Sequence, residues 1–225
     1  MGKAVRPGFI KTFIGYTGPE LATQEALYGF VMALIFITSA QVGLISYSSP
    51  WDLVILILGM NFVWGFIDMY IFYRMDVTAQ KRYTEMLKIS SEEPGKHRKE
   101  LYDAVGSTIF DALTEEDKEK AVDLLEKGRV GTHEEMRHDR KDMFLSAVSC
   151  FIITLLTTIP MIICLLAISD TAEALYWTTV VACVCLFVVG YRLEPNESRR
   201  DKVLSGVLIA VTAYGLTFFA TYLGG

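Results

Sequence analysis

The chain has 225 residues, of which 52% are hydrophobic and 21% charged, and its formal net charge is −5. This apolar share is too high for an ordinary soluble domain of this length unless lipid solvates part of the surface. The composition therefore excludes a purely water-soluble fold and favours a membrane protein.

Five apolar segments are each about as long as a helix that crosses the hydrocarbon core of a bilayer. They cover residues 26–46, 53–73, 144–168, 174–191 and 203–223. We therefore predict an all-α polytopic membrane protein with five transmembrane helices and a charged helical insert between the second and the third. The expected divisions are 1–74 with the first two spans, the insert at 75–142, and 143–225 with the last three spans.

The positive charges give the orientation. All 21 Lys and Arg residues precede the first span, separate the second from the third, or separate the fourth from the fifth. By the positive-inside rule, the N-terminus and the insert are cytoplasmic and the C-terminus is outside. No secretory signal peptide is visible, and we expect the cell membrane as the location.

Polar residues of the second span are the first candidates for function. Asp68 lies near its cytoplasmic end, and Asn61, seven residues earlier, projects from nearly the same face, with Gly65 between them. An acid within a membrane span is costly unless it faces water or a partner. We interpret Asp68 as the titrating group of a path for a cation or a proton. The alternative is an acid near the interface that is paired with Arg74 or hydrogen-bonded to a neighbouring helix.

The first span adds to this predicted path. Thr38 and Gln41 share a helix face, while Glu25 and Tyr28 lie at the cytoplasmic start, where they could join Asp68 at an inner gate. The alternative for Glu25 is a simple interfacial charge.

Small residues and cysteines complete the description of the spans. The pairs Ser39–Gly43 and Gly206–Ala210 favour close helix packing, within one subunit or across a dimer. We expect Thr157 and Thr158 to satisfy the backbone carbonyl that Pro160 frees in the third span. The four cysteines all lie in predicted spans, where we expect free thiols rather than a disulfide or a zinc site: Cys150, Cys164, Cys183 and Cys185.

The sequence pattern predicts that the insert is a helical unit. Residues 76–89 extend the second span, and a second helix follows at about 97–113, with an apolar stripe of Leu101, Val105, Ile109 and Leu113. A third helix starts at Thr114 and ends at Gly128.

The last helix of the insert begins with a capping box of Thr132 and Glu135, and we expect it to continue without a break into the third span. Its first turns combine imidazole and carboxylate groups, which suit iron(II), manganese or zinc. The alternative is a solvated charged face, because Arg137, Arg140 and Lys141 lie between the acids. The candidate metal ligands are Glu85, Glu134, Glu135, His138, Asp139 and Asp142.

The C-terminal half resembles the vacuolar iron transporter family. The shared features are Pro160 in the middle of a Leu155–Leu166 span, Gly190 at the end of the fourth span, and Gly206 followed by Tyr214-Gly215 in the fifth. The resemblance implies export of iron(II) or manganese by proton exchange. It also implies a homodimer with a pore between the first two spans, and metal capture by carboxylates of the insert.

The chain departs from the family pattern at several ligand positions. Tyr28-Gly29 stands where the family has an Asp-Gly pair, so Asp68 would have to substitute for that acid. Met60 or Met69 would match the family's membrane methionine. The first helix of the insert offers mainly Glu85, then Glu92 and Glu93, where that of the family has regularly spaced glutamates.

From these observations we expect a transporter that moves iron(II) or manganese out of the cytosol in exchange for protons. The alternative is a non-transporting scaffold or sensor that binds metal or a partner through the insert. No nucleophile–base set, phosphate loop or zinc motif indicates an enzyme. We expect no organic cofactor and no nucleic-acid partner.

Overall fold

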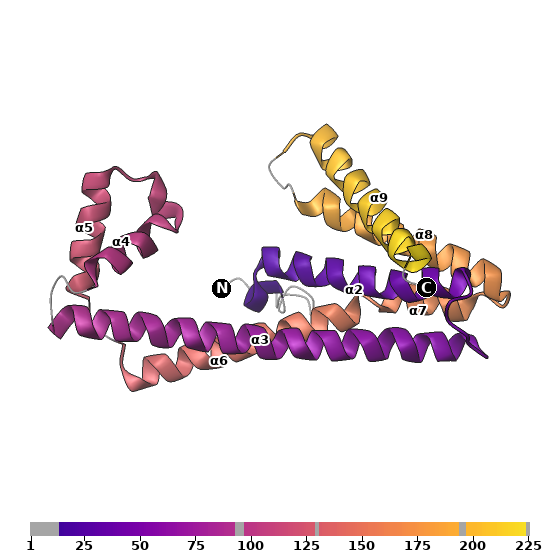
Figure 1. Ribbon diagram of the computed structural model, residues 1–225, viewed down its shortest axis with the longest axis horizontal. Helices are drawn as coiled ribbons and strands as arrows, with labels where there is room; N and C mark the ends of the chain where they lie inside the picture. The colour runs from indigo at the N-terminus through magenta and orange to yellow at the C-terminus, as the bar shows by residue number, and fades with distance from the viewer. Residues whose placement is uncertain (1–13, 93–96, 129–130, 194–196, 224–225) are drawn as a thin grey trace, which may run out of the picture. The chain divides into compact units, whose positions relative to one another are not determined.

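The computed structural model describes residues 14–92, 97–128, 131–193 and 197–223, which form helices and no strand (Figure 1). The long helices are α2 (Pro19–Gln41), α3 (Pro50–Glu92), α6 (His133–Leu156), α8 (Thr171–Leu193) and α9 (Arg199–Leu223); the short ones are α4 (Arg98–Gly106), η1 (Ile109–Ala112), α5 (Glu115–Glu126) and α7 (Ile159–Ala167). Five segments are long and apolar enough to cross a membrane, with α6 and α7 counted as one. The predicted all-α membrane fold is confirmed.

The chain divides into two compact units, which are described separately. The membrane unit contains the described residues up to Ile71 and those from Leu145 onward, and the insert unit is Phe72–Phe144. These bounds fall within a few residues of the expected divisions.

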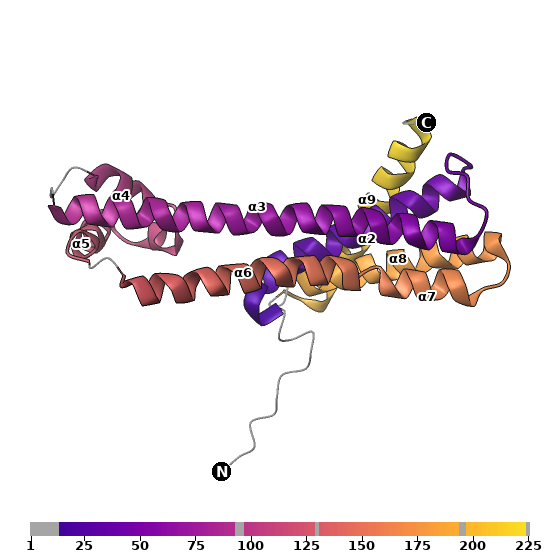
Figure 2. The same cartoon turned by 90° about the horizontal axis from the view of Figure 1, so that it is seen from below.

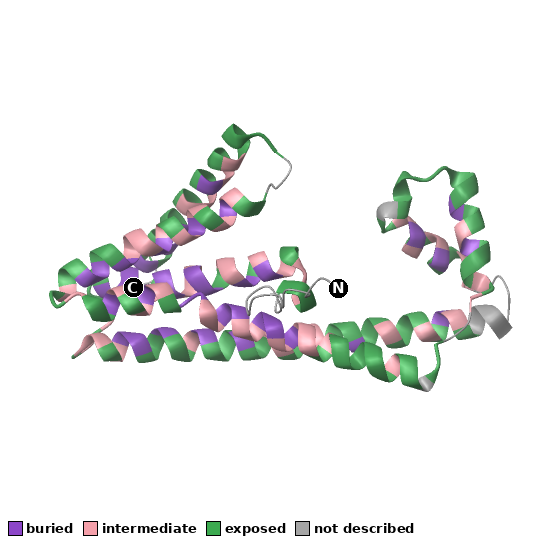
Figure 3. Cartoon of the chain, turned by 180° about the vertical axis from the view of Figure 1, so that it is seen from behind, coloured by how far each residue is buried: buried purple, intermediate pink, exposed green. Residues whose placement is uncertain are grey.

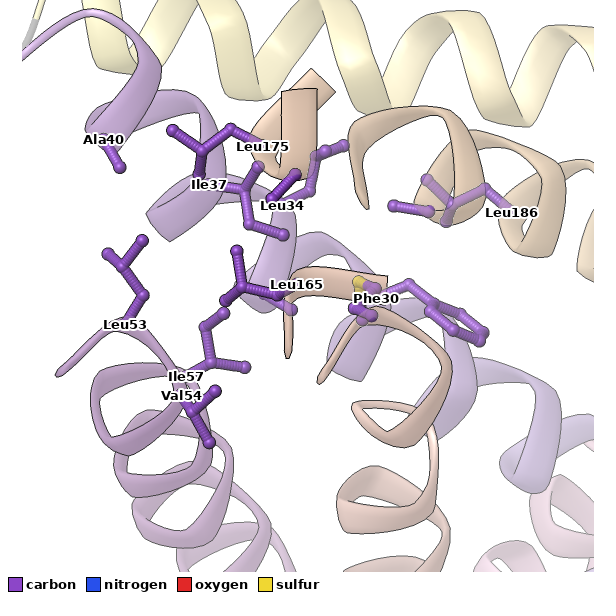
Figure 4. Close-up of a cluster of buried hydrophobic side chains, with 14 of the residues drawn as sticks. Phe30, Leu34, Ile37, Ala40, Leu53, Val54, Ile57, Leu165, Leu175 and Leu186 are labelled. Carbon is purple, nitrogen blue, oxygen red and sulfur yellow. The ribbon is translucent and has the colours of Figure 1, made fainter. Parts of the chain in front are cut away.

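Helix α2 is the centre of the membrane unit. In the most apolar 18-residue stretch of α2, 44% of the stretch is buried, whereas the share for α9 is 17%. Helix α2 is therefore enclosed by its neighbours, while α9 lies at the periphery. Leu34 and Ile37 are fully buried, and they form one apolar cluster with side chains of α3, α7 and α8 (Figure 4). The labelled members from those helices are Leu53, Val54, Ile57, Leu165, Leu175 and Leu186.

Large apolar side chains cover the outward faces of the membrane unit. Along α3, for example, Ile55, Phe62 and Trp64 are exposed, although water would disfavour such a surface (Figure 3). Lipid contact explains this pattern, because the hydrocarbon core solvates apolar side chains.

The first span ends earlier than predicted, at Gln41 instead of residue 46. Gly43 has a positive φ of 77°, and the amides of Gly43 and Leu44 bond to the carbonyls of Ala40 and Ser39, which is a Schellman motif. No atom lies within 4 Å of a Cβ built on Gly43. Within the described part of this chain Gly43 therefore makes no close helix contact and instead terminates the helix. Packing of the Ser39–Gly43 pair across a dimer stays a prediction.

The last helix of the insert continues without a break into the third span, as predicted, because α6 covers His133–Leu156. The third span itself is interrupted at Pro160. α6 ends at Leu156 and α7 begins at Ile159, because Pro160 has no N–H to donate to the carbonyl four residues earlier. The hydroxyls of Thr157 and Thr158 donate to the carbonyls of Thr154 and Leu155 at 2.7 Å each. The two hydroxyls therefore bond to carbonyls beside the break, but neither bonds to the carbonyl of Leu156, which Pro160 frees, so the contact differs from the expected one.

Close packing of α8 and α9 depends on two glycines. A Cβ on Gly190 would lie 2.8 Å from the Cα of Gly206, and one on Gly206 would lie 2.8 Å from the ring of Phe187. The predicted packing role of Gly206 is confirmed, and its partner lies within the same chain.

The insert unit has a small core of its own. Met86 of α3 packs with Leu101 and Val105 of α4 and with Val122 of α5. The expected helix at 97–113 ends at Gly106, and a separate 3-10 turn, η1, follows, so Leu113 leaves the stripe and is 38% exposed. The side chain of Ile109 lies outside the described residues.

The other predicted insert boundaries are confirmed. α3 continues unbroken from the second span, and α5 begins after Thr114, whose hydroxyl accepts a bond from the amide of Asp117 (Figure 2). Arg98 joins α4 to α5 through ion pairs with Glu119, Asp123 and Glu126.

Candidate functional site

Glu25 is the most unusual polar residue of the membrane unit. It lies on α2 with none of its surface exposed, so the interpretation of it as an interfacial charge is wrong. Its Oε2 accepts a 2.6 Å hydrogen bond from the hydroxyl of Thr154 on α6, and its Oε1 is buried without a hydrogen-bond partner in the described part of the chain. A buried carboxylate oxygen without a partner is costly and marks a place where a proton or a cation would be favourable.

Two glycines bring three helices together at this carboxylate. A Cβ on Gly29 of α2 would lie 2.0 Å from the Thr157 hydroxyl and 2.9 Å from the Thr154 carbonyl, so only glycine fits there. On α3, a Cβ on Gly65 would lie 3.4 Å from the Thr154 side chain. Thr154 is thus the common neighbour of α2 and α3, and its hydroxyl donates to Glu25.

Asp68 lies one turn beyond Gly65 on α3 and is half-buried. α3 and α6 run antiparallel, so this turn brings Asp68 level with Cys150, one turn before Thr154 (Figure 2). Asp68 interacts electrostatically with both Glu25 and Cys150. No Lys or Arg among the residues that the structure describes forms an ion pair with Glu25 or Asp68, and the suggested Asp68–Arg74 pair is absent there.

Asn61 occupies the other end of the same face. The antiparallel register places it level with the α6–α7 break, and it is fully buried. Its Nδ2 donates to the carbonyl of Ile57 at 2.9 Å, whereas its Oδ1 has no hydrogen-bond partner within the described residues. An open amide oxygen therefore lies beside a helix break, an arrangement typical of ion sites in membrane carriers.

The other predicted path residues are not brought to this site. Thr38 pairs with Thr221 of α9 at 3.1 Å, and Gln41 donates to Thr179 of α8 at 2.9 Å. Met60 is half-buried next to Asn61, and Tyr28 is 44% exposed. Glu25 and Asp68 thus lie close to each other, Asn61 lies two turns from Asp68 on α3, and Thr38 and Gln41 connect α2 to the last two spans.

The candidate metal ligands of the insert have local partners instead. Glu135 accepts from the amide and hydroxyl of Thr132 at 2.7 and 3.0 Å, which confirms the capping box. His138 lies 3.2 Å from Asp142, and Asp139 accepts from Gln80 at 3.3 Å. Glu85 and Glu134 are exposed. These contacts favour the solvated charged face.

Over the described ranges, no three His, Cys, Asp or Glu side chains are arranged to hold a metal ion. The oxygen atoms near Glu25 instead belong to the Thr154 hydroxyl and the Asp68 carboxylate. Such hard donors suit magnesium, calcium or manganese.

Sequence reasoning missed Thr154, Gly29 and Cys150 as parts of the site. Thr154 and Gly29 have common structural roles in membrane helices, so neither stands out in a sequence. The spacing of polar residues in the third span was a usable signal nevertheless. Thr154 and Thr157 follow Cys150 by four and seven residues, which places the three on one helix face.

No family model, curated protein or solved structure matches this chain. Membership of the vacuolar iron transporter family therefore stays a prediction.

Proposed function

We propose that this chain is a membrane transporter that moves a divalent cation, manganese or iron(II), out of the cytosol in exchange for protons. The observation that carries the proposal is the complete burial of Glu25 with one oxygen unpartnered in the described part of the chain. An ionised carboxylate in such a place needs a positive charge beside it, and a neutral one needs a proton. Alternation between the two is the chemistry of cation–proton exchange.

The order of the polar groups supports a route. Asp68 of α3 is half-buried, whereas Glu25 of α2 and Asn61 of α3 are fully buried, so the exposure of the polar groups falls from Asp68 to the two inner groups. In this scheme a cation meets Asp68 first and loses water there. It then passes to Glu25 and to the open oxygen of Asn61, and protons leave the two carboxyl groups as it binds.

The proposed cargo follows from the ligands and from the resemblance. Carboxylate and amide oxygens suit manganese, and the family resemblance adds iron(II). A homodimer and a location in the cell membrane also stay predictions.

Flux into proteoliposomes that contain a manganese- and iron(II)-sensitive dye tests the proposal. We expect wild-type protein to move at least one of the two ions and Glu25→Gln to abolish the flux, because the amide cannot ionise. Glu20→Gln is the matched control: Glu20 is an exposed acid on the same helix, so the substitution should leave the flux unchanged. Equal flux in wild type and Glu25→Gln would overturn the assigned role of Glu25.

The second candidate is a scaffold or sensor that binds a partner through the insert. It is favoured by the separate core of the insert unit and by Leu124 of α5, which is 71% exposed. Absence of flux for any divalent ion, with correctly folded protein, would favour this function over transport.

A further inference from the structure

An open groove of about 510 Å³ lies along α3, in the part of the helix that belongs to the insert unit. All of the side chains that line it are exposed, and none of them is acidic: Arg74, Met75, Thr78, Ala79, Arg82 and Tyr83. The acids of the same stretch, Asp76 and Glu85, do not line the groove. The groove is therefore positively charged.

The two arginines of the groove are available to an external anion. Within the ranges that the structure describes, neither Arg74 nor Arg82 forms an ion pair, whereas Arg98 of the same unit pairs with three acids. Helix α6 contacts α3 through other residues, since Tyr73 packs on Phe144 and Gln80 donates to Asp139. The guanidinium groups of the groove thus keep their hydrogen-bond donors open.

The groove begins where the apolar segment of α3 ends. That segment ends at residue 73, and α3 continues as one unbroken helix to Glu92 (Figure 2). A helix rises 1.5 Å per residue, so Arg74 and Arg82 are about 12 Å apart along its axis. The headgroup layer on each side of a bilayer's hydrocarbon core is about 5–8 Å thick. Arg74 therefore lies at the depth of lipid headgroups and Arg82 just beyond them.

The spacing of the polar groups suits a phosphate. Thr78 lies one helical turn from each arginine, so its hydroxyl is between the two guanidinium groups along the groove. The planar fork of arginine matches phosphate oxygens and bonds to them in pairs, and a threonine hydroxyl can donate one bond more.

We propose that this groove binds the phosphate headgroup of an anionic phospholipid in the leaflet on the side of the insert. Met75 favours a lipid over a soluble phosphate compound. It is 61% exposed beside Arg74, at the end of the groove next to the span, where an acyl chain would cover it and water would not. Basic residues directly beyond a membrane helix are a recurrent mode of anionic lipid recognition.

Lipid binding to the purified full-length protein in detergent tests the inference. Native mass spectrometry gives dissociation constants for phosphatidylglycerol and for phosphatidylcholine with the same acyl chains. We expect wild type to prefer phosphatidylglycerol, and Arg74→Gln/Arg82→Gln to weaken its binding by about 30-fold, because each arginine near a membrane surface contributes about a factor of five.

A second double variant controls for net charge. Arg137→Gln/Arg140→Gln removes two exposed arginines from α6 of the same unit, and neither lines the groove. We expect it to bind phosphatidylglycerol like wild type. Thermal unfolding of both double variants shows that the fold is retained, as expected for exposed side chains. Equal weakening in the two double variants, or equal binding of the two lipids by wild type, overturns the inference.

Inorganic phosphate separates the two sources of the ligand. We expect it to compete weakly, because it makes no contact with Met75. Inorganic phosphate that binds as tightly as phosphatidylglycerol assigns the groove to a soluble phosphate compound and overturns the lipid as its ligand. These measurements involve no cation flux, so the inference stands or fails independently of the proposed transport.

Discussion

At the scale of single residues, the burial of Glu25 depends on two glycines, Gly29 and Gly65. Gly29 allows the Thr157 hydroxyl to occupy the space of a Cβ, and Gly65 allows α3 to contact Thr154. Close approach of this kind removes Glu25 from lipid and from water, leaving Thr154 as its hydrogen-bond donor. The site is thus produced by packing rather than by a run of polar residues.

Gly29→Ala tests this packing. The new methyl group would lie 2.0 Å from the Thr157 hydroxyl, so α2 must move away from α6. We expect a loss of about 1–3 kcal/mol in stability, together with a large loss of flux. Gly59→Ala on α3 is the control, because no atom lies within 4 Å of its Cβ position. Equal thermal unfolding of the two variants in detergent would contradict the packing account.

The Thr154 hydroxyl gives a second prediction. Thr154→Val keeps the shape of the side chain but removes the donor to Glu25, and we expect it to cost about 1 kcal/mol of stability. It should also change the pH at which flux is half-maximal, because the carboxylate loses a bond that favours its ionised form. Thr154→Ser should behave like wild type. A pH profile of flux for the three proteins checks this; identical profiles would remove Thr154 from the site.

Only some residues of the candidate site could be predicted from the sequence. Asp68 and Asn61 were recognisable because polar groups within an apolar span are conspicuous. Glu25 was recognised as polar, but its burial was not, since it lies close to the charged N-terminal segment. Thr154, Gly29 and Cys150 were missed because their importance comes from contacts between helices far apart in sequence.

At the scale of elements, the helices follow local signals wherever the signal is a cap or a proline. The Thr114 and Thr132 caps and the extension of α3 were predictable from short patterns. Local signals for the end of α2 at Gly43 and for the break before Pro160 are also present in the sequence. Hydropathy alone does not reveal them, because the apolar segments continue past both positions. Hydropathy reports where lipid contact is possible and not where a helix stops.

The start of α5 provides a test at this scale. The Thr114 hydroxyl bonds to the amide and the carboxylate of Asp117, and these contacts, with Lys120, lower the pKa of Asp117 below its ordinary value of 3.8. We expect Thr114→Ala to destabilise α5 by about 1 kcal/mol, while Thr114→Ser retains the cap. Hydrogen exchange of the α5 amides in the full-length protein measures the difference; equal protection in all three proteins would contradict the capping role.

The lowered pKa of Asp117 also fixes the sign of a pH effect. Its ionised form contributes stability that is present above the ordinary pKa and is lost as the pH falls through the lowered value. The difference in α5 stability between wild type and Thr114→Ala should therefore shrink below about pH 4. A stability difference between wild type and Thr114→Ala that grows as the pH falls would show that the cap does not stabilise the ionised form of Asp117.

At the scale of the whole molecule, two units share two long helices: α3 and α6 each contribute residues to the membrane unit and to the insert unit. The five-span outline was predictable because lipid imposes helix length and apolar composition on any spanning segment. The function of the insert was not, since its predicted metal ligands proved to be engaged in caps and helix pairs or exposed to solvent. We therefore propose the membrane unit, rather than the insert, as the place where the cation binds.

The most direct test of that assignment is proton movement driven by a cation gradient. Proteoliposomes with an internal pH-sensitive dye are given a gradient of manganese or iron(II) without any imposed pH difference. For wild type we expect protons to move against the direction of cation flow, and for Glu25→Gln we expect no proton movement, with Glu20→Gln behaving like wild type. Cation flux without proton movement in wild type, or unchanged proton movement in Glu25→Gln, would contradict the account.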